Sequence, residues 1–324
     1  MTLRTKLGAL VYDVPRFVRS LRGERWLEMH NRNERITRDA HGVRCEWEFT
    51  SDLHIATVYP AAGAMLLRIA LRRWPIVRTT RNAEMRTESP RVTIVIGHRG
   101  FERLPHLLAT IETVAAQTIP VECIVVEQDV EPRIASQLPP WVRHLFTPCD
   151  TAYNRSAAFN AGVTAARAPI VILHDNDMLA PAAYAAECVA RANDGFDFLE
   201  LKRFVFYLGE EETARVFASR DVPHLTPATV VQNAVGASTA ARRDAYFDAG
   251  GFDEGFVGWG GEDNEFWERA EISGRANRFG YLPFIHLYHP PQRGKADPAN
   301  PAIARYYQIR AISPEKRRET LRNR

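Results

Sequence analysis

The sequence predicts an α/β fold in which a mostly parallel β-sheet is flanked by helices and is preceded by a helix-rich N-terminal extension. Three observations lead to this prediction. Short β-branched runs at residues 92–96, 121–126 and 170–173 are each typical of a strand buried on both faces. Segments with helical apolar spacing separate these runs, and strands that alternate with helices favour parallel pairing. Each run also ends in a polar cluster, where such sheets bind ligands.

The first 90 residues are expected to be mostly helical and irregular, and to form a region of their own. Residues 1–25 form an Arg-rich amphipathic segment rather than a secretory signal, because no apolar run or small-residue cleavage site follows them. The longest apolar stretch, residues 55–67, has 13 residues and contains Pro60 and Gly63. A membrane span needs roughly 20 residues, so only peripheral membrane contact is expected.

The remaining elements are expected downstream of the first strand. Residues 102–116 show helical apolar spacing, and a small-residue helix at 154–166 precedes the third strand. A Gly-rich loop then leads into a helix predicted for 262–274, and an extended segment begins near Phe279. We therefore expect three regions, which are a basic extension at 1–90, a main domain at 91–300 and a basic helical tail at 301–324.

The composition is that of an ordinary globular protein, because 45% of the 324 residues are hydrophobic and 25% are charged. Four scattered cysteines show no metal-ligand spacing and favour a reducing compartment. The net charge of +3 combines +7 in residues 1–91, −8 in residues 92–309 and +4 in residues 310–324. An acidic middle often houses metal-assisted chemistry, and basic ends suggest contact with phosphates or anionic lipid. A solvated surface with an accidental bias explains the split equally well.

Two motifs carry carboxylates suited to chemistry. Asp175 and Asp177, directly after the third strand, can hold a divalent cation that bridges a diphosphate, although such triplets are also common in solvated turns. Glycines around Trp259 form a loop that leads to the adjacent acids Glu262 and Asp263. Acids that converge on one pocket differ in pKa, so one of them can act as a base. The alternative is an acidic helix start after a glycine hinge.

A histidine pair completes the candidate site. His286 and His289 are three residues apart and can bind a metal together with one of the preceding aspartates, although such pairs are more often structural. No GxGxxG sequence follows the first strand, and no GxxxxGK[ST] sequence occurs anywhere. The site is therefore expected to be neither a dinucleotide site nor a P-loop.

With these motifs in place, residues 92–295 resemble a glycosyltransferase of the Rossmann-like GT-A fold. They are similar to the bacterial chondroitin-polymerase-type family 2 enzymes and to the animal β-1,4-galactosyltransferases. The resemblance covers about 200 residues, and four motifs in the same order make it specific. The motifs are HRGFE at 98–102, YNR followed by NAG at 153–162, WGGED followed by NEF at 259–266, and YH followed by a Pro-rich GK at 288–295.

The resemblance implies a metal-dependent, inverting transfer of galactose or N-acetylgalactosamine from a UDP-sugar, with formation of a β-linkage. Asp263 would be the general base, and Glu262 would hold sugar hydroxyls. Asp177 and His289 would ligate the divalent metal, Mn²⁺ being favoured over Mg²⁺, and His286 occupies a metal-ligand position where the galactosyltransferases have Met. The donor pocket would be formed by Arg99, Glu127, Asp129, Arg155, Asp175, Trp259, Gly260 and Gly261.

The expected partners are the UDP-sugar and a saccharide or lipid-linked glycan acceptor, and no nucleic acid. The expected location is the cytoplasm, with peripheral contact between the basic ends and the inner membrane face. Two alternatives stay open, which are a carbohydrate-binding protein without turnover and a retaining transferase. The intact acidic motifs disfavour the first. The retaining polypeptide N-acetylgalactosaminyltransferases have Asn where this chain has Asp263, which favours inversion.

Overall fold

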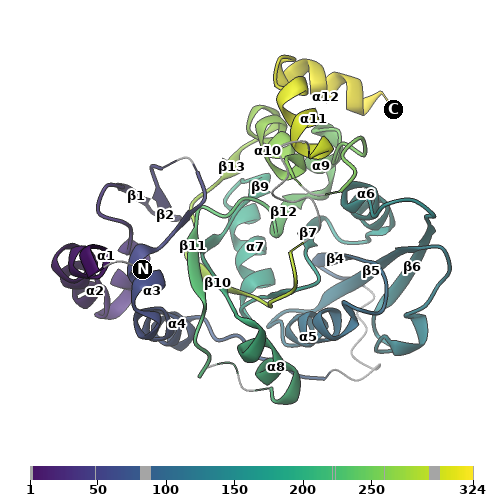
Figure 1. The fold of residues 1–324 in the computed structure, drawn as a ribbon. Helices are drawn as coiled ribbons and strands as arrows, with labels where there is room; N and C mark the ends of the chain where they lie inside the picture. The colour runs from purple at the N-terminus through teal and green to yellow at the C-terminus, as the bar shows by residue number, and fades with distance from the viewer. Residues whose placement is uncertain are drawn as a thin grey trace.

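A computed structural model describes residues 3–47, 49–80, 89–220, 222, 224–258, 260–291 and 300–323 of the chain. Its strands form a seven-stranded sheet, a five-stranded sheet and a two-stranded hairpin (Figure 1). Helices cover both faces of the larger sheet, which confirms the predicted fold class. Among the described helices, none has the length and apolar character that a membrane span requires.

The larger sheet is mostly parallel. Its strands lie in the order β13-β9-β12-β7-β4-β5-β6, and four of the six neighbouring pairs are parallel. Of the described strands in this sheet, only β12 runs antiparallel to both of its neighbours. The strand bounds are β4 (Val92–His98), β5 (Val121–Asp129), β6 (Arg143–Pro148), β7 (Ile170–His174), β9 (Phe198–Leu199), β12 (Ser238–Arg242) and β13 (Ala276–Asn277).

The three predicted strands are present, and each continues beyond its predicted end. β4 reaches His98, β5 reaches Asp129 and β7 reaches His174. The polar side chains in these extensions are buried, and His98 and Glu127 are both 0% exposed. The sequence pattern alone suggested loops here because the residues are polar. The strands are parallel, so their carboxyl ends meet at one edge of the sheet.

Helices pack on both faces of this sheet, because successive side chains of a strand point to opposite sides. Ile94 and Ile96 pack in the core under α5 and α7, whereas Val95 packs under α6. The helix α6 lies close to the sheet, since a Cβ at Gly162 would lie 2.1 Å from Val95 Cγ1. The helix bounds are α5 (Leu104–Ala115), α6 (Arg155–Ala165), α7 (Tyr184–Asn193), α9 (Arg243–Asp248) and α10 (Glu262–Ser273).

The smaller sheet has the order β3-β11-β10-β14-β8. The strand β8 begins directly after Asp177 and pairs with β14, which ends at His286. This pairing places two distant parts of the sequence side by side at the same edge. The strand bounds are β3 (Ser51–Asp52), β8 (Met178–Leu179), β10 (Lys202–Tyr207), β11 (Thr229–Gln232) and β14 (Leu282–His286).

The N-terminal region packs against the smaller sheet. Its strand β3 pairs with β11, and Leu53, Leu66 and Leu67 share one hydrophobic core with Phe204 and Ile285. The loss of apolar surface from water therefore attaches this region to the rest of the chain. Its elements are α1 (Leu3–Gly8), the π-helix η1 (Ala9–Asp13), α2 (Val14–Ser20), η2 (Gly23–Glu28), β1 (Ile36–Asp39), β2 (Gly42–Cys45), α3 (His54–Val58) and α4 (Pro60–Arg73).

The C-terminal helices pack on α10, on the side of the molecule away from the N-terminal region (Figure 1). Arg317 is 6% exposed and pairs there with Glu265 and Glu268. Part of the positive charge of the tail is thus neutralised inside the fold. The remaining elements are η4 (Ala135–Gln137), α8 (Glu210–Ala218), α11 (Pro301–Ile309) and α12 (Pro314–Arg322).

Candidate active site

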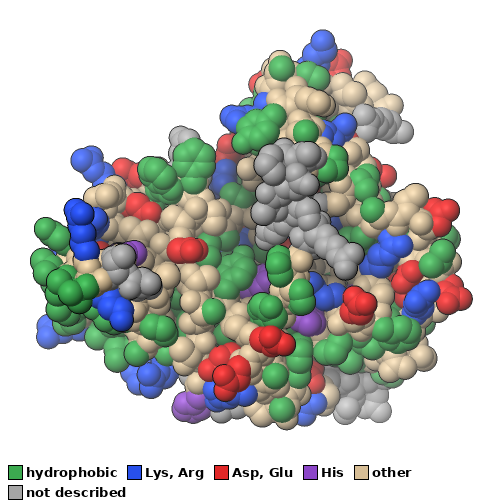
Figure 2. All heavy atoms as spheres, viewed as in Figure 1, with side chains coloured by type: hydrophobic (Ala, Val, Ile, Leu, Met, Phe, Trp, Pro, Cys, Tyr) green, Lys and Arg blue, Asp and Glu red, His purple; other side chains and the backbone are tan. Residues whose placement is uncertain are grey.

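A cavity of about 920 Å³ opens at the edge where β4, β5 and β7 end. Figure 2 shows His side chains near the middle of the visible face, between the N-terminal region and the larger sheet. The cavity is lined by residues of the aspartate motif, of the adjacent acids after the glycine loop and of the histidine pair. Those that line it are Asp175, Asp177, Glu262, Asp263, His286 and His289.

One cluster in the cavity wall, called the first end below, is formed by Asp177 and the histidine pair. Asp177 Oδ1 lies 3.7 Å from His286 Nε2, and Asp177 Oδ2 lies 3.5 Å from His289 Nε2. One ligand atom from each of the three residues lies within 4.8 Å of the others. The pairing of β8 with β14 places His286 here, and Tyr207 stacks on its ring with centroids 4.4 Å apart.

This cluster fits a divalent cation. Asp177 is 4% exposed, and its Oδ1 atom has no hydrogen-bond partner among the described residues. A buried carboxylate oxygen without a partner is costly unless a ligand satisfies it. Burial alone would raise the pKa of Asp177, but His286, Arg103 and His289 outweigh burial and lower it. One carboxylate and two imidazoles form a mixed oxygen and nitrogen donor set that can hold a divalent metal ion.

Arg103 is a residue at this end that sequence reasoning missed. Its guanidinium donates to Asp177, and it lies 3.3 Å from Asn176 Oδ1. The motif comparison had covered Arg99 and Glu102, and Arg103 is the next residue along the same loop. A basic residue at the start of α5 was therefore the available signal. Its charge adds to the positive potential at the end of the cavity where Asp177 lies.

A second cluster in the cavity wall, called the second end below, consists of acids around Arg155. Arg155 Nε lies 2.8 Å from Asp175 Oδ1, and its Nη1 atom lies 2.9 Å from Asp263 Oδ1. The same Nη1 atom lies 3.5 Å from Glu262 Oε1. Arg155 is the first residue of α6, so the helix holds the guanidinium between the strand end and the start of α10. One arginine thus links both predicted acidic motifs.

Two carboxyl groups of this cluster, those of Glu262 and Asp175, hold their protons more tightly than usual. Burial, and then the nearby charge of Asp263, raises the pKa of Glu262 to about 7. Burial also raises the pKa of Asp175, although Arg155 opposes the shift. The three acids share one guanidinium, which cannot neutralise all of them at once. The raised pKa of Glu262 therefore lies in the range where this side chain can exchange a proton near neutral pH.

The backbone around Asp263 is built to accommodate its carboxylate. Gly236 has a φ of +79°, and a Cβ there would lie 2.0 Å from Asp263 Oδ2. Gly260 and Gly261 have φ values of +117° and +89°, a region that favours glycine. The Gly260 N–H donates to Glu262 Oε2 over 2.9 Å. These glycines let the loop turn sharply into α10 with both acids directed at the cavity.

The predicted donor-binding residues divide into two groups. Arg99, Asp129 and Arg155 line the cavity, as do Asp175, Gly260 and Gly261. Glu127 is not among the lining residues, because its carboxylate accepts from Arg133 N at 2.8 Å and pairs with His144 Nε2 at 2.8 Å. Trp259, together with Gly294 and Lys295 of the last motif, lies outside the described residues.

Aromatic side chains that the sequence reasoning did not single out also line the cavity. Tyr306 and Tyr307 on α11 lie on one side, and Tyr288 lies beside the histidine pair. Tyr307 is 67% exposed, and Tyr306 donates from its hydroxyl to Glu268 at 2.6 Å. Helix α11 lies far along the chain from the recognised motifs, and only its packing on α10 brings it to the cavity.

Comparison with known proteins agrees with this geometry. A family model described as the N-terminal domain of galactosyltransferase matches residues 218–290. The matched segment contains Glu262, Asp263, His286 and His289, which are four of the six motif residues in the cavity. A search of curated protein sequences finds no match.

Two solved structures are similar to the chain. The mannosyltransferase PcManGT from Pyrobaculum calidifontis, in complex with GDP-Man and Mn²⁺, aligns with a TM-score of 0.44 and 16% identity over 74% of this chain and 68% of that one. TarS 1–349 from S. aureus aligns with a TM-score of 0.42 and 13% identity over 61% of this chain. The alignment spans 58% of the TarS chain, which is less than two thirds of its length. The match to the galactosyltransferase model and the observed α/β fold together confirm the prediction of a glycosyltransferase of the GT-A type.

Proposed function

We propose that the chain transfers a hexose, galactose or N-acetylgalactosamine, from a UDP-sugar with inversion, forming a β-linkage on a saccharide or lipid-linked glycan. One observation carries the proposal. A single cavity is lined both by a cation-type cluster of Asp177, His286 and His289 and by the acids Glu262 and Asp263. A glycosyl transfer needs stabilisation of the leaving diphosphate and a base on the opposite face of the sugar.

At the first end, Asp177, His289 and His286 would hold the divalent cation, with Mn²⁺ favoured over Mg²⁺. Such an ion, when bound, supplies charge neutralisation to the departing diphosphate. Arg103 lies against Asp177 and adds a second positive charge on the same side. Arg99 and Asp129 line the cavity nearby, so we assign them to the nucleotide. We assign no donor contact to Glu127, because its Oε1 atom accepts from the loop after β5 and its Oε2 atom pairs with His144 on β6.

At the second end, Asp263 would accept the proton of the acceptor hydroxyl. Its contact with Arg155 holds the carboxylate in one orientation. Glu262 has a pKa raised to about 7 by burial, so it can donate or accept a hydrogen bond toward a sugar hydroxyl. One base without a second nucleophilic carboxylate leads to inversion, because the acceptor oxygen attacks the face opposite the leaving group.

The rim of the cavity suits a glycan acceptor. Tyr288 and Tyr307 are 36% and 67% exposed and line the cavity, so each presents an apolar ring to solvent. We infer a cytoplasmic reaction, because Cys45, Cys123, Cys149 and Cys188 are free thiols, as expected in a reducing compartment. The basic ends of the chain also favour peripheral contact with an anionic membrane surface.

A donor panel tests the proposal. Purified protein is incubated with UDP-galactose, UDP-N-acetylgalactosamine, UDP-glucose and GDP-mannose, with Mn²⁺ or with EDTA, and release of the nucleoside diphosphate is measured. We expect turnover of a UDP-hexose with Mn²⁺ and loss of turnover with EDTA. NMR of the product should show a β-anomer. Preference for GDP-mannose, turnover in EDTA or an α-linked product would each contradict the corresponding part of the proposal, and binding without turnover would favour a carbohydrate-binding protein.

A further inference from the structure

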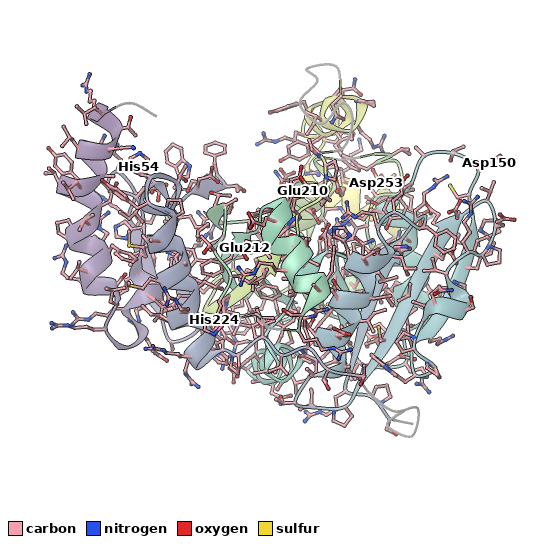
Figure 3. All side chains as sticks on the ribbon, turned by 60° about the horizontal axis from the view of Figure 1, so that its bottom comes forward. His54, Asp150, Glu210, Glu212, His224 and Asp253 are labelled. Carbon is pink, nitrogen blue, oxygen red and sulfur yellow. The ribbon has the colours of Figure 1, made fainter. Side chains whose placement is uncertain are left out.

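The first helical stretch of the chain has two apolar faces. Helices α1, η1 and α2 follow one another without interruption from residue 3 to residue 20, at the edge of the molecule (Figure 1). One face packs inward through Ala9, Asp13, Phe17 and Ser20, which are all less than 9% exposed. His54 at the start of α3 fixes this face, because its Nδ1 atom lies 2.9 Å from Asp13 Oδ2 (Figure 3). The stretch is therefore attached to the body of the protein.

The second apolar face is exposed to solvent. Its members recur at the three- and four-residue spacing that places side chains along one side of a helix. Their exposed fractions run from 51% to 73%, and no described part of the chain covers them further. These residues, called the apolar stripe below, are Leu3, Leu7, Leu10, Val11 and Val18.

Within residues 3–22, every exposed charged side chain is positive. Residues 3–22 contain five Lys and Arg residues and a single acid, which is the buried Asp13. The four exposed basic residues make no ion pair within the described part of the chain, and they are Arg4, Lys6, Arg19 and Arg22. Figure 2 shows apolar and basic side chains gathered together over α1 and α2. A helix with an apolar stripe and a cationic flank is suited to the boundary between lipid headgroups and acyl chains.

We propose that residues 3–22 bind the surface of an anionic lipid bilayer, with the apolar stripe inserted among the acyl chains and the basic residues at the headgroups. The inward face stays packed on α3 and α4, so binding requires no unfolding. The occupant is a bilayer rather than an acidic protein because the stripe is long, aliphatic and bordered by basic side chains that are free to reach lipid phosphates.

Within its described residues, the C-terminal basic segment lacks an apolar stripe like that of residues 3–22, and some of its basic side chains are paired with acids. Arg317 on α12 is buried against Glu265 and Glu268, and Arg322 lies 3.2 Å from Asp248 Oδ1. Among the described residues of α12, none is a large exposed hydrophobic side chain. The two basic ends also lie on different sides of the molecule (Figure 1). We therefore assign membrane contact to residues 3–22 and not to α12.

The test is sedimentation of the full chain with vesicles of phosphatidylcholine, with or without phosphatidylglycerol. We expect the wild-type protein to sediment with the vesicles that contain phosphatidylglycerol. The double variant Leu7→Gln/Leu10→Gln should partition at least about tenfold less, since it removes two inserted side chains. Its matched control is Phe247→Gln/Ile272→Gln, which alters two side chains that are each 40% exposed elsewhere and should bind like the wild type.

A second pair of variants tests the charge. Arg4→Gln/Arg19→Gln should lower binding about tenfold at physiological salt, whereas Arg318→Gln/Arg322→Gln on α12 should not change it. Equal binding by the Leu7/Leu10 variant and the wild type would overturn the proposal. A wild-type dimer in light scattering that the Leu7/Leu10 variant abolishes, without vesicle binding by either, would overturn it by showing that a second copy covers the stripe. The assay needs no donor and no turnover, so its outcome is separate from that of the transferase test.

Discussion

The two aspartates of the Asp175-Asn176-Asp177 motif lie two residues apart and belong to different side-chain clusters in one cavity, the first end and the second end. Asp177 faces His286, His289 and Arg103, and one of its oxygens has no hydrogen-bond partner among the described residues. Asp175 faces Arg155, which already satisfies its Oδ1 atom at 2.8 Å. Two carboxylates of one motif therefore have different roles because their neighbours differ. Asp177 is available to a cation, whereas Asp175 is bound within the protein.

The ionisation of the two ends differs in the same way. At the first end, positive neighbours overcome the effect of burial and lower the pKa of Asp177. At the second end, burial and the charges of neighbouring acids raise the pKa of Asp175 and of Glu262. The Asp177 carboxylate at the first end is therefore favoured in its anionic form, whereas Glu262 at the second end can exchange a proton. Three substitutions test this division.

The largest effect is expected from Asp177→Asn. The amide keeps the shape of the side chain but loses the negative charge that would attract the cation. We expect the rate of transfer to fall by about a thousandfold, and Mn²⁺ binding measured by electron paramagnetic resonance to weaken in parallel. Asp150→Asn, on an exposed loop (Figure 3), is the matched control and should change neither quantity. Full Mn²⁺ binding by the Asp177 variant would remove this residue from the ligand set.

A smaller loss of rate is expected from Asp263→Asn, which removes the base and leaves the first end intact. The value of kcat should fall by about a hundredfold or more, because general base catalysis contributes on that scale. Binding of UDP and Mn²⁺, measured by calorimetry, should stay close to that of the wild type. Equal losses in binding and in turnover would instead mean that Asp263 has a structural role beside Gly236.

The smallest effect is expected from Glu262→Gln, and it concerns the pH dependence of stability. The pKa of Glu262 is about 7 in the fold against an ordinary value of 4.5, so the folded chain binds this proton more tightly than the unfolded chain. The stability contributed by the protonated form is complete below about pH 4.5 and is lost as the pH rises through about 7. Between roughly pH 5 and pH 8, the unfolding free energy of the wild type should therefore fall by about 2 kcal/mol more than that of the variant.

Urea unfolding at several pH values measures this difference. Glu210→Gln is the control, because Glu210 lies exposed on α8 (Figure 3) and should leave the pH dependence unchanged. The same pH slope in the Glu262 variant and the wild type would show that Glu262 is ionised throughout this range, and the two ends of the cavity would then be alike in charge.

The sequence by itself determined the strands that carry the site and the residues that could react. Buried β-branched runs mark β4, β5 and β7 without any knowledge of their neighbours, because a strand covered on both faces needs apolar side chains at every position. The acids Glu262 and Asp263, the histidine pair and Asp177 could likewise be recognised from local motifs. The glycosyltransferase class was expected from the resemblance of four motifs to known transferases, and the match to the galactosyltransferase family model supports it.

Only the tertiary structure decided what each of these residues contacts. Glu127 belongs to the polar cluster expected at the end of the second strand, yet its carboxylate is engaged inside the fold by His144 and by the loop at Arg133. Arg103 and Arg155 acquire their roles from carboxylates far along the chain, which no local pattern encodes. The same is true of residues 3–22, because the sequence does not show which of their apolar side chains pack in the core and which face solvent. A side chain's burial and its charge partners depend on segments distant in sequence, so they are established only when the chain has folded.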